Sequence, residues 1–186
     1  RPELETPDVQ FFFVHGSFAS SKDRKLDKEP GMTLAVYQCR PESQGTIHIG
    51  GPNPFDAPKI RPNFLDNQLD QDTLVAGLNL CRSIGETNAM KQHISHEMNP
   101  GSSIRTEEEM LQFARDTGAT TYHPMGTCKM GSDPMAVVDD RLRVHGIENL
   151  RVADASIMPT MPSGNINAPV IMIAEKAADM IKEDNR

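Results

Sequence analysis

Tryptophan is absent from this 186-residue chain, and there are only 3 cysteines, Cys39, Cys81 and Cys128. So few and so scattered cysteines do not make a disulfide framework, and without a CxxC pair a thiolate zinc site is not expected. A reduced, cytoplasmic location is the simpler expectation. The longest wholly apolar stretch, residues 168–174, is far shorter than the roughly 20 residues of a membrane-spanning helix, so we expect no transmembrane segment.

Cations are in the minority, with 19 Lys and Arg against 26 Asp and Glu, which gives a net charge of −7. Binding to nucleic acid or to an anionic membrane surface requires clustered cations, so we expect neither partner. Hydrophobic residues make up 37% and charged residues 24% of the chain, a balance that supports a packed core rather than disorder.

The first half of the chain has three segments with the composition of β-strands, at residues 9–14, 33–39 and 45–50. The polar segment 17–31 between the first two is expected to be a mobile loop. Because no helical pattern separates the strands, we expect one antiparallel sheet. His48 lies on the third strand, where the alternation of side chains predicts that it points to solvent or to the outer face of the sheet.

Helical patterns follow the strands. Residues 72–84 carry leucines on one face and end at Gly85. Thr106 and Glu109 have the spacing of a capping box, which predicts that a helix begins there. The predicted fold class is therefore α+β, an antiparallel sheet with flanking helices.

Special residues are concentrated in the second half. The segment 121–131 contains His123 and two glycines, and it predicts a tight loop. Residues 150–156 are expected to form a strand that ends in Asp154 and small side chains. Asn167 is the expected N-cap of a final helix, since asparagine is favoured at that position. The apolar residues at helical spacing behind it are expected to be buried: Val170, Ile173, Ala174, Ala177 and Ile181.

Three of these blocks, in this order, resemble the glucose–methanol–choline (GMC) oxidoreductases, in particular their choline dehydrogenase-like members. The blocks are Tyr122–Gly131, Leu150–Ser156 and Asn165–Pro169. Residues 39–46 are also similar to the strand that opens the substrate domain of the family. The resemblance covers essentially the whole chain.

The resemblance implies a division of the chain. Residues 1–120 would form the substrate-binding domain, and residues 121–186 would carry the catalytic segments and the terminal strand and helix that complete the FAD domain. The family binds FAD through an N-terminal Rossmann unit with a GxGxxG turn, and no GxG occurs here. We therefore expect the chain, which starts at Arg1 without a methionine, to be a fragment that lacks this domain and binds FAD poorly alone.

The resemblance also implies the chemistry. FAD would accept a hydride from a small-molecule alcohol, choline-like or another primary alcohol, with His123 as base and Asn165 as the donor to the substrate oxygen. Dioxygen and a quinone both remain open as electron acceptors. The matching cofactor-binding residues are Asp154, Ala155, Ile166, Asn167, Ala168 and Pro169.

Other interpretations of the same residues remain open. The chain could be a substrate-binding or interaction module that has lost catalysis. His93 and His96 could belong to a metal-dependent hydrolase, although no third ligand is identifiable, so we expect no metal. Cys128 is expected to be a small buried apolar residue.

Overall fold

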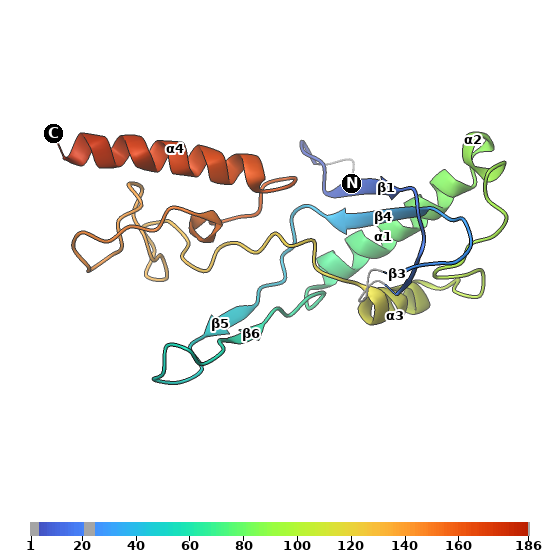
Figure 1. The fold of residues 1–186 in the computed structure, drawn as a ribbon, viewed down its shortest axis with the longest axis horizontal. Helices are drawn as coiled ribbons and strands as arrows, with labels where there is room; N and C mark the ends of the chain where they lie inside the picture. The colour runs from blue at the N-terminus through green and yellow to red at the C-terminus, as the bar shows by residue number, and fades with distance from the viewer. Residues whose placement is uncertain (1–3, 21–24, 186) are drawn as a thin grey trace. The chain divides into compact units, whose positions relative to one another are not determined.

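The computed structural model of the protein describes residues 4–20 and 25–185, which form two compact units (Figure 1). Unit 1 comprises residues 1–44 and 63–121, and unit 2 comprises residues 45–62 and 122–186. Residues 45–62 thus cluster with the C-terminal part of the chain and not with the first 120 residues. The functional roles predicted for the two parts of the chain stay predictions.

Unit 1 is built on a pair of antiparallel strands, β1 (Val9–Val14) and β4 (Thr33–Gln38), in the register that sets Val9 opposite Gln38. Both strands lie where the sequence predicts them. Aromatic and β-branched residues favour this conformation because their side chains pack well on a pleated surface. The third predicted strand does not join this pair, so the expectation of one antiparallel sheet is wrong.

The segment predicted as a mobile loop contains two short strands, β2 (Phe18–Ser20) and β3 (Lys25–Leu26), which pair antiparallel with a bulge. Residues 21–24 of that segment lie outside the described residues. The Asp27 N–H donates to the carbonyl of Ser17 at 3.0 Å and holds the base of this hairpin together.

Helix α1 (Gln68–Gly85) begins four residues before the predicted start because Asn67 caps it. The Asn67 side chain accepts a hydrogen bond from the Leu69 N–H at 2.8 Å, which satisfies one of the free donors of the first turn. The helix packs against β4. A Cβ on Gly77 would lie only 2.9 Å from a methyl group of Val36, so this close approach requires glycine.

Two more helices complete unit 1, the short α2 (Asn88–Lys91) and α3 (Glu107–Thr117). The predicted capping box is confirmed. The Glu109 N–H donates to the Thr106 hydroxyl at 3.2 Å, and the Thr106 N–H donates to the Glu109 carboxylate at 2.9 Å. Helix α3 packs on α1 and buries Met110 and Ala114.

Unit 2 begins with a hairpin of β5 (Thr46–His48) and β6 (Lys59–Arg61), with Ile47 opposite Ile60. The third predicted strand therefore exists, but it belongs to a separate sheet. Its residues are exposed, and the prediction that His48 faces solvent is confirmed. Together with the strands of unit 1, the described residues thus contain helices and three two-stranded antiparallel sheets.

The rest of unit 2 is largely irregular, with a single 3-10 turn, η1 (Ala155–Ile157), and the helix α4 (Asn167–Asp184) in the described residues. The prediction of a strand at residues 150–156, which was expected to complete the FAD domain, is wrong. Only Arg151 forms an isolated bridge there, with Arg143, and the chain coils into η1 four residues later.

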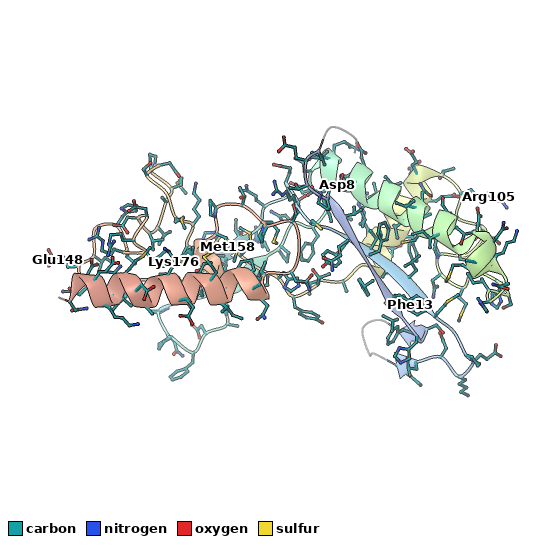
Figure 2. All side chains as sticks on the ribbon, turned by 90° about the horizontal axis from the view of Figure 1, so that it is seen from above. Asp8, Phe13, Arg105, Glu148, Met158 and Lys176 are labelled. Carbon is teal, nitrogen blue, oxygen red and sulfur yellow. The ribbon has the colours of Figure 1, made fainter. Side chains whose placement is uncertain are left out.

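A hydrophobic cluster holds unit 2 together. Its buried members are Val138, Leu142, Ile157, Met158, Ile166, Ile173 and Ala177. Figure 2 shows Met158 beside α4, on the chain that leaves η1. Of the face of α4 expected to be buried, Ile173 and Ala177 are buried, whereas Ala174 and Ile181 are exposed, so that prediction is only partly right. None of the helices in the described part of the chain has the length and apolar character needed to cross a membrane.

Candidate active site

His123 lies on the irregular segment that follows α3, and its imidazole is half-buried. The preceding residue, Tyr122, has φ +62°, a left-handed conformation that bulky residues rarely adopt. Its side chain is 69% exposed. The following residue, Pro124, fixes its own φ and restricts His123 to extended conformations. The backbone direction at His123 is therefore set from both sides.

Three backbone hydrogen bonds, which we call the rung bonds, join the loop after His123 to the segment around η1. Three N–H groups of alternate residues donate to three consecutive carbonyls: Gly126 to Ala155 at 3.3 Å, Cys128 to Ser156 at 2.9 Å and Met130 to Ile157 at 2.8 Å. Gly126 has φ +84°, and a Cβ there would lie 3.3 Å from the Met158 carbonyl oxygen. This left-handed conformation and close approach favour glycine.

Asp154 is the N-cap of η1. Its carboxylate accepts a hydrogen bond from the Ser156 N–H at 2.7 Å. The side chain is otherwise exposed, and Ala155 after it is half-buried. Within this chain the Asp154 carboxylate therefore has a local structural partner, which is the turn-forming role that an aspartate at the end of an extended segment often plays.

Helix α4 starts two residues after Asn165, whose side chain is exposed. Ile166 is the N-cap, and no side chain caps the helix. The prediction that Asn167 is the N-cap is therefore wrong, because Asn167 is already the first helical residue. Ile166 is only 8% exposed and packs into the hydrophobic cluster, which draws the start of α4 onto the core.

The donors at the start of α4 suit the electron-rich edge of a flavin. Asn167 and Ala168 are exposed in the first turn, where N–H groups have no partner within the helix, and Pro169 has no N–H. A helix N-terminus also carries a partial positive charge. Because the side chain of Ile166 is buried, that residue can meet a cofactor only through its backbone. Such donors fit an electron-rich group such as the one that the resemblance implies.

All the predicted site residues belong to unit 2. The loop after His123 is bonded to η1, and η1 contacts α4 through the cluster that contains Ile157 and Ile166. The structure thus brings the segments of the two candidate catalytic residues, His123 and Asn165, onto one core.

Comparison with known proteins gives the family. A sequence profile described as GMC oxidoreductase matches residues 41–174. The chain belongs to the GMC oxidoreductase family. It is 42% identical over 180 residues to the alcohol dehydrogenase (acceptor) of Pseudomonas putida, and this match covers 97% of the chain and 32% of that protein. It is 44% identical over 184 residues to human mitochondrial choline dehydrogenase, and this match covers 98% of the chain and 31% of that protein.

Two solved structures are similar to this chain over nearly all of its length. Pyridoxine 4-oxidase from Mesorbium loti aligns with a TM-score of 0.88 at 32% identity, over 95% of this chain and 35% of that one. A formate oxidase from Aspergillus oryzae RIB40, solved in a study of FAD modification, aligns with a TM-score of 0.86 at 30% identity, over 97% and 32%. The chain spans about a third of the length of the curated relatives described above.

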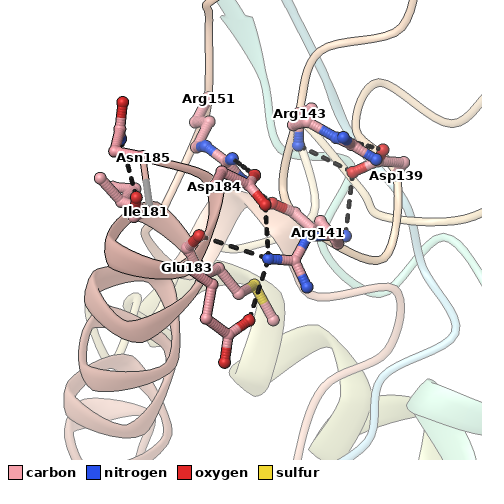
Figure 3. A network of polar contacts seen from close by, with 9 residues as sticks. Asp139, Arg141, Arg143, Arg151, Ile181, Glu183, Asp184 and Asn185 are labelled. Carbon is pink, nitrogen blue, oxygen red and sulfur yellow. Dashed lines mark hydrogen bonds and ion pairs between the residues drawn. The ribbon is translucent and has the colours of Figure 1, made fainter.

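The sequence analysis missed a polar cluster at the C-terminal end of α4 (Figure 3). Arg141 donates to the Met180 carbonyl at 3.3 Å and to the carboxylates of Glu183 at 3.1 Å and Asp184 at 2.8 Å. Arg151 donates to the Asp184 carboxylate and to the Arg141 carbonyl. We call Arg141, Arg151, Glu183 and Asp184 the α4 clamp.

Electrostatics explains the α4 clamp. Hydrogen bonds from Arg151 and then Arg141 hold the pKa of Asp184 below its usual range. Carboxylates at a helix C-terminus are unfavourable because that end carries a partial negative charge. The adjacent acidic residues Glu183 and Asp184 at the end of a helical pattern are the sequence signal that could have predicted cationic partners.

The structure gives the metal interpretation no third ligand. His93 and His96 are exposed, and the Ser95 hydroxyl lies 2.9 Å from Nδ1 of His96. The neighbouring Glu97 carboxylate is engaged by the Arg82 guanidinium at 2.8 and 3.1 Å. Residues 4–20 and 25–185 contain no group of three or more His, Cys, Asp or Glu able to hold a metal ion. Cys128, expected to be buried, is half-buried.

Proposed function

We propose that the chain is the C-terminal part of an FAD-dependent oxidoreductase that oxidises a small-molecule alcohol, choline-like or another primary alcohol. The observation that carries the proposal is that the family match, residues 41–174, includes both His123 and Asn165, and that both belong to unit 2. The relatives named as alcohol dehydrogenase and choline dehydrogenase support the substrate class.

His123 takes the hydroxyl proton in this proposal. Oxidation of an alcohol to a carbonyl removes that proton together with a hydride from carbon, and bound FAD supplies the hydride acceptor. The imidazole is half-buried, so part of it stays open to a small substrate, and Tyr122 and Pro124 restrict the backbone that carries it. Imidazole is well suited to accept a proton near neutral pH.

Asn165 binds the substrate oxygen. Its exposed amide carries two N–H donors, which stabilise the negative charge that develops on oxygen as the proton leaves. The next residue, Ile166, is fixed in the hydrophobic cluster, so the Asn165 backbone stands on a rigid element.

The residues that hold FAD are, in this proposal, the backbone of Asp154 and Ala155 on the ribityl–phosphate side and the first turn of α4 at the flavin ring. The residues of α4 and its start are Ile166, Asn167, Ala168 and Pro169. Residues 1–120 contribute the substrate-binding domain and residues 121–186 complete the FAD domain. A Rossmann unit that would cradle the pyrophosphate is assigned to sequence outside these 186 residues.

The first experiment is the visible absorption spectrum of the complete native polypeptide, before and after anaerobic addition of choline and simple primary alcohols. A flavin band that bleaches on addition supports the proposal and ranks the substrates. Subsequent addition of oxygen or of a quinone identifies the electron acceptor. A colourless protein would favour the non-catalytic binding module instead.

Two substitutions then test the assigned roles. We expect His123→Ala to lower the rate constant of flavin reduction on the order of a hundredfold or more with flavin still bound. Asn165→Ala should lower the same rate constant by a smaller factor. His93→Ala, at an exposed histidine of unit 1, is the control and should leave the rate unchanged. Near-normal turnover of His123→Ala would refute its role as base.

A further inference from the structure

We propose that the Asp154 carboxylate is a positioning group for His123 and not a ligand of the cofactor. The proposal rests on the function proposed above, since it assigns a role within that site. It changes the expectation for Asp154: only its backbone is left to contact FAD, while its side chain acts on the protein.

The first step is the cap. The Asp154 carboxylate accepts the Ser156 N–H at 2.7 Å and so fixes the turn that starts η1. Without an acceptor at this position the first N–H groups of the turn have no partner, and the extended backbone that these residues favour in sequence competes with the turn. The cap therefore selects the coiled conformation of residues 155–157.

The second step is what that conformation presents. In η1 three consecutive carbonyls, those of Ala155, Ser156 and Ile157, accept the rung bonds from the loop after His123. In an extended strand successive carbonyls point to opposite sides, so consecutive residues would not accept from one neighbouring segment in this way. The rung bonds exist because η1 is turned.

The third step fixes η1 itself. Ile157 and Met158 are buried in the hydrophobic cluster with Ile166, the N-cap of α4. The turn therefore has one side on the core that carries the start of α4 and the other side on the loop that carries His123. A change in η1 alters the position of His123 relative to Asn165.

The last step is the short tether. Only Pro124 and Met125 separate His123 from Gly126, whose N–H donates the first rung bond. Even a fully extended chain can therefore carry His123 no more than roughly 10 Å from Gly126. Gly126 also approaches the Met158 carbonyl oxygen closely. Because a displacement of about 1 Å can lower a rate a hundredfold, loss of these contacts should be visible in the chemistry.

The test compares Asp154→Ala, Asp154→Asn and Asn53→Ala in the complete native polypeptide. Asparagine keeps an oxygen that can accept the Ser156 N–H but removes the charge. Asn53 is the matched control, because its side-chain oxygen accepts the Phe55 N–H at 3.1 Å in the same two-residue geometry, in a turn of unit 2 that is distant in sequence from residues 126–130. The readouts are amide hydrogen exchange at Cys128 and Met130, the limiting rate constant of flavin reduction and the FAD dissociation constant.

We expect Asp154→Ala to accelerate exchange at both amides at least tenfold and to lower the reduction rate constant at least tenfold. Asp154→Asn should change each by less than threefold, and Asn53→Ala by less than twofold. Equal weakening of FAD binding by Asp154→Ala and Asp154→Asn would overturn the proposal, since the charge would then contact the cofactor. Exchange in Asp154→Ala that matches Asn53→Ala would overturn it as well.

Two features keep the test decisive. If Asp154→Ala fails to fold, Asp154→Ser replaces it, because a serine hydroxyl is also a good capping acceptor. Asp154→Ser must then keep both amides protected, and loss of protection in the folded variant overturns the proposal. If the protein has no flavin, the proposed function fails, but the exchange comparison still tests the positioning role.

Discussion

Asp70 offers the sharpest test of how unit 1 is held together, and we predict that Asp70→Ala is strongly destabilising. The carboxylate is only 1% exposed, in the first turn of α1. It accepts hydrogen bonds from the Gln38 amide at 2.9 Å, the Glu42 N–H at 2.8 Å and the Ser43 N–H at 2.7 Å. It therefore joins β4, the chain that leaves it, and α1.

The magnitude follows from the three bonds. A hydrogen bond to a charged group contributes about 1.5–3 kcal/mol, and removing one partner of a buried set leaves the others unsatisfied. Glu42 is exposed and Ser43 half-buried, so their N–H groups regain part of this energy from water. We expect Asp70→Ala to lower the free energy of unfolding by about 3 kcal/mol.

The effect should depend on pH. Burial raises the pKa of Asp70, but hydrogen bonds from Ser43, Glu42 and Gln38 outweigh it, and the pKa lies below its ordinary value. A carboxyl whose pKa is lower in the folded state stabilises the protein above its unfolded pKa, and this contribution is lost as pH falls through the folded pKa. The difference between wild type and Asp70→Ala should therefore shrink at acidic pH.

The assay is urea denaturation of the complete polypeptide at neutral and acidic pH, with amide exchange at Glu42 and Ser43 to locate the change. Asp72→Ala is the control, since Asp72 is exposed in the first turns of α1 and accepts the Gln68 amide at 2.7 Å. If Asp70→Ala costs no more than Asp72→Ala at neutral pH, the three hydrogen bonds do not hold unit 1 in the way argued.

Three further substitutions test other contacts. Gly77→Ala should destabilise by about 1–2 kcal/mol despite its better helix propensity, because the new Cβ meets Val36 at 2.9 Å, and adding Val36→Ala should remove the clash; a stabilised single variant would contradict this. Thr106→Ala should cost about 1 kcal/mol in urea denaturation and Thr106→Ser only a few tenths, and equal losses would refute the capping role. Arg151→Ala should lower the melting temperature more than Arg143→Ala, whose ion pair lies within its own turn, and the difference should shrink in high salt; equal effects would count against the α4 clamp.

Features that depend on neighbours in sequence could be predicted. The capping box of Thr106 and Glu109 is a contact between residues three apart, and strand composition at 9–14 and 33–39 was enough to locate β1 and β4. The family motif also identified the segments that unit 2 brings onto one core. Their functional roles rest on that resemblance, since nothing in the spacing of His123 and Asn165 relates them.

Features that depend on residues distant in sequence could not be predicted. Asp70 binds residues 27–32 positions away, and no local pattern distinguishes it from the exposed Asp72. Residues 150–156 have strand composition, but the cap from Asp154 and the burial of Ile157 favour a turn. Asn167 has the right residue type for an N-cap, but Ile166 is buried in the hydrophobic cluster and becomes the N-cap instead. The helix therefore starts at Asn167, one residue before the predicted start.

Unit 2 shows why an irregular backbone can still hold a catalytic group in place. Between residue 122 and η1 the described chain has only isolated bridges, yet several of its N–H groups are paired: Cys128 and Met130 bond to η1, Val137 bonds to Lys129, and His145 bonds to Val137. The bonds of Cys128 and Met130 fix the loop to a turn whose Ile157 is buried in the core. In the proposed site, the position of His123 then depends on these anchors and not on local secondary structure, which is why the capping carboxylate of Asp154, next to the first rung-bond acceptor Ala155, matters there.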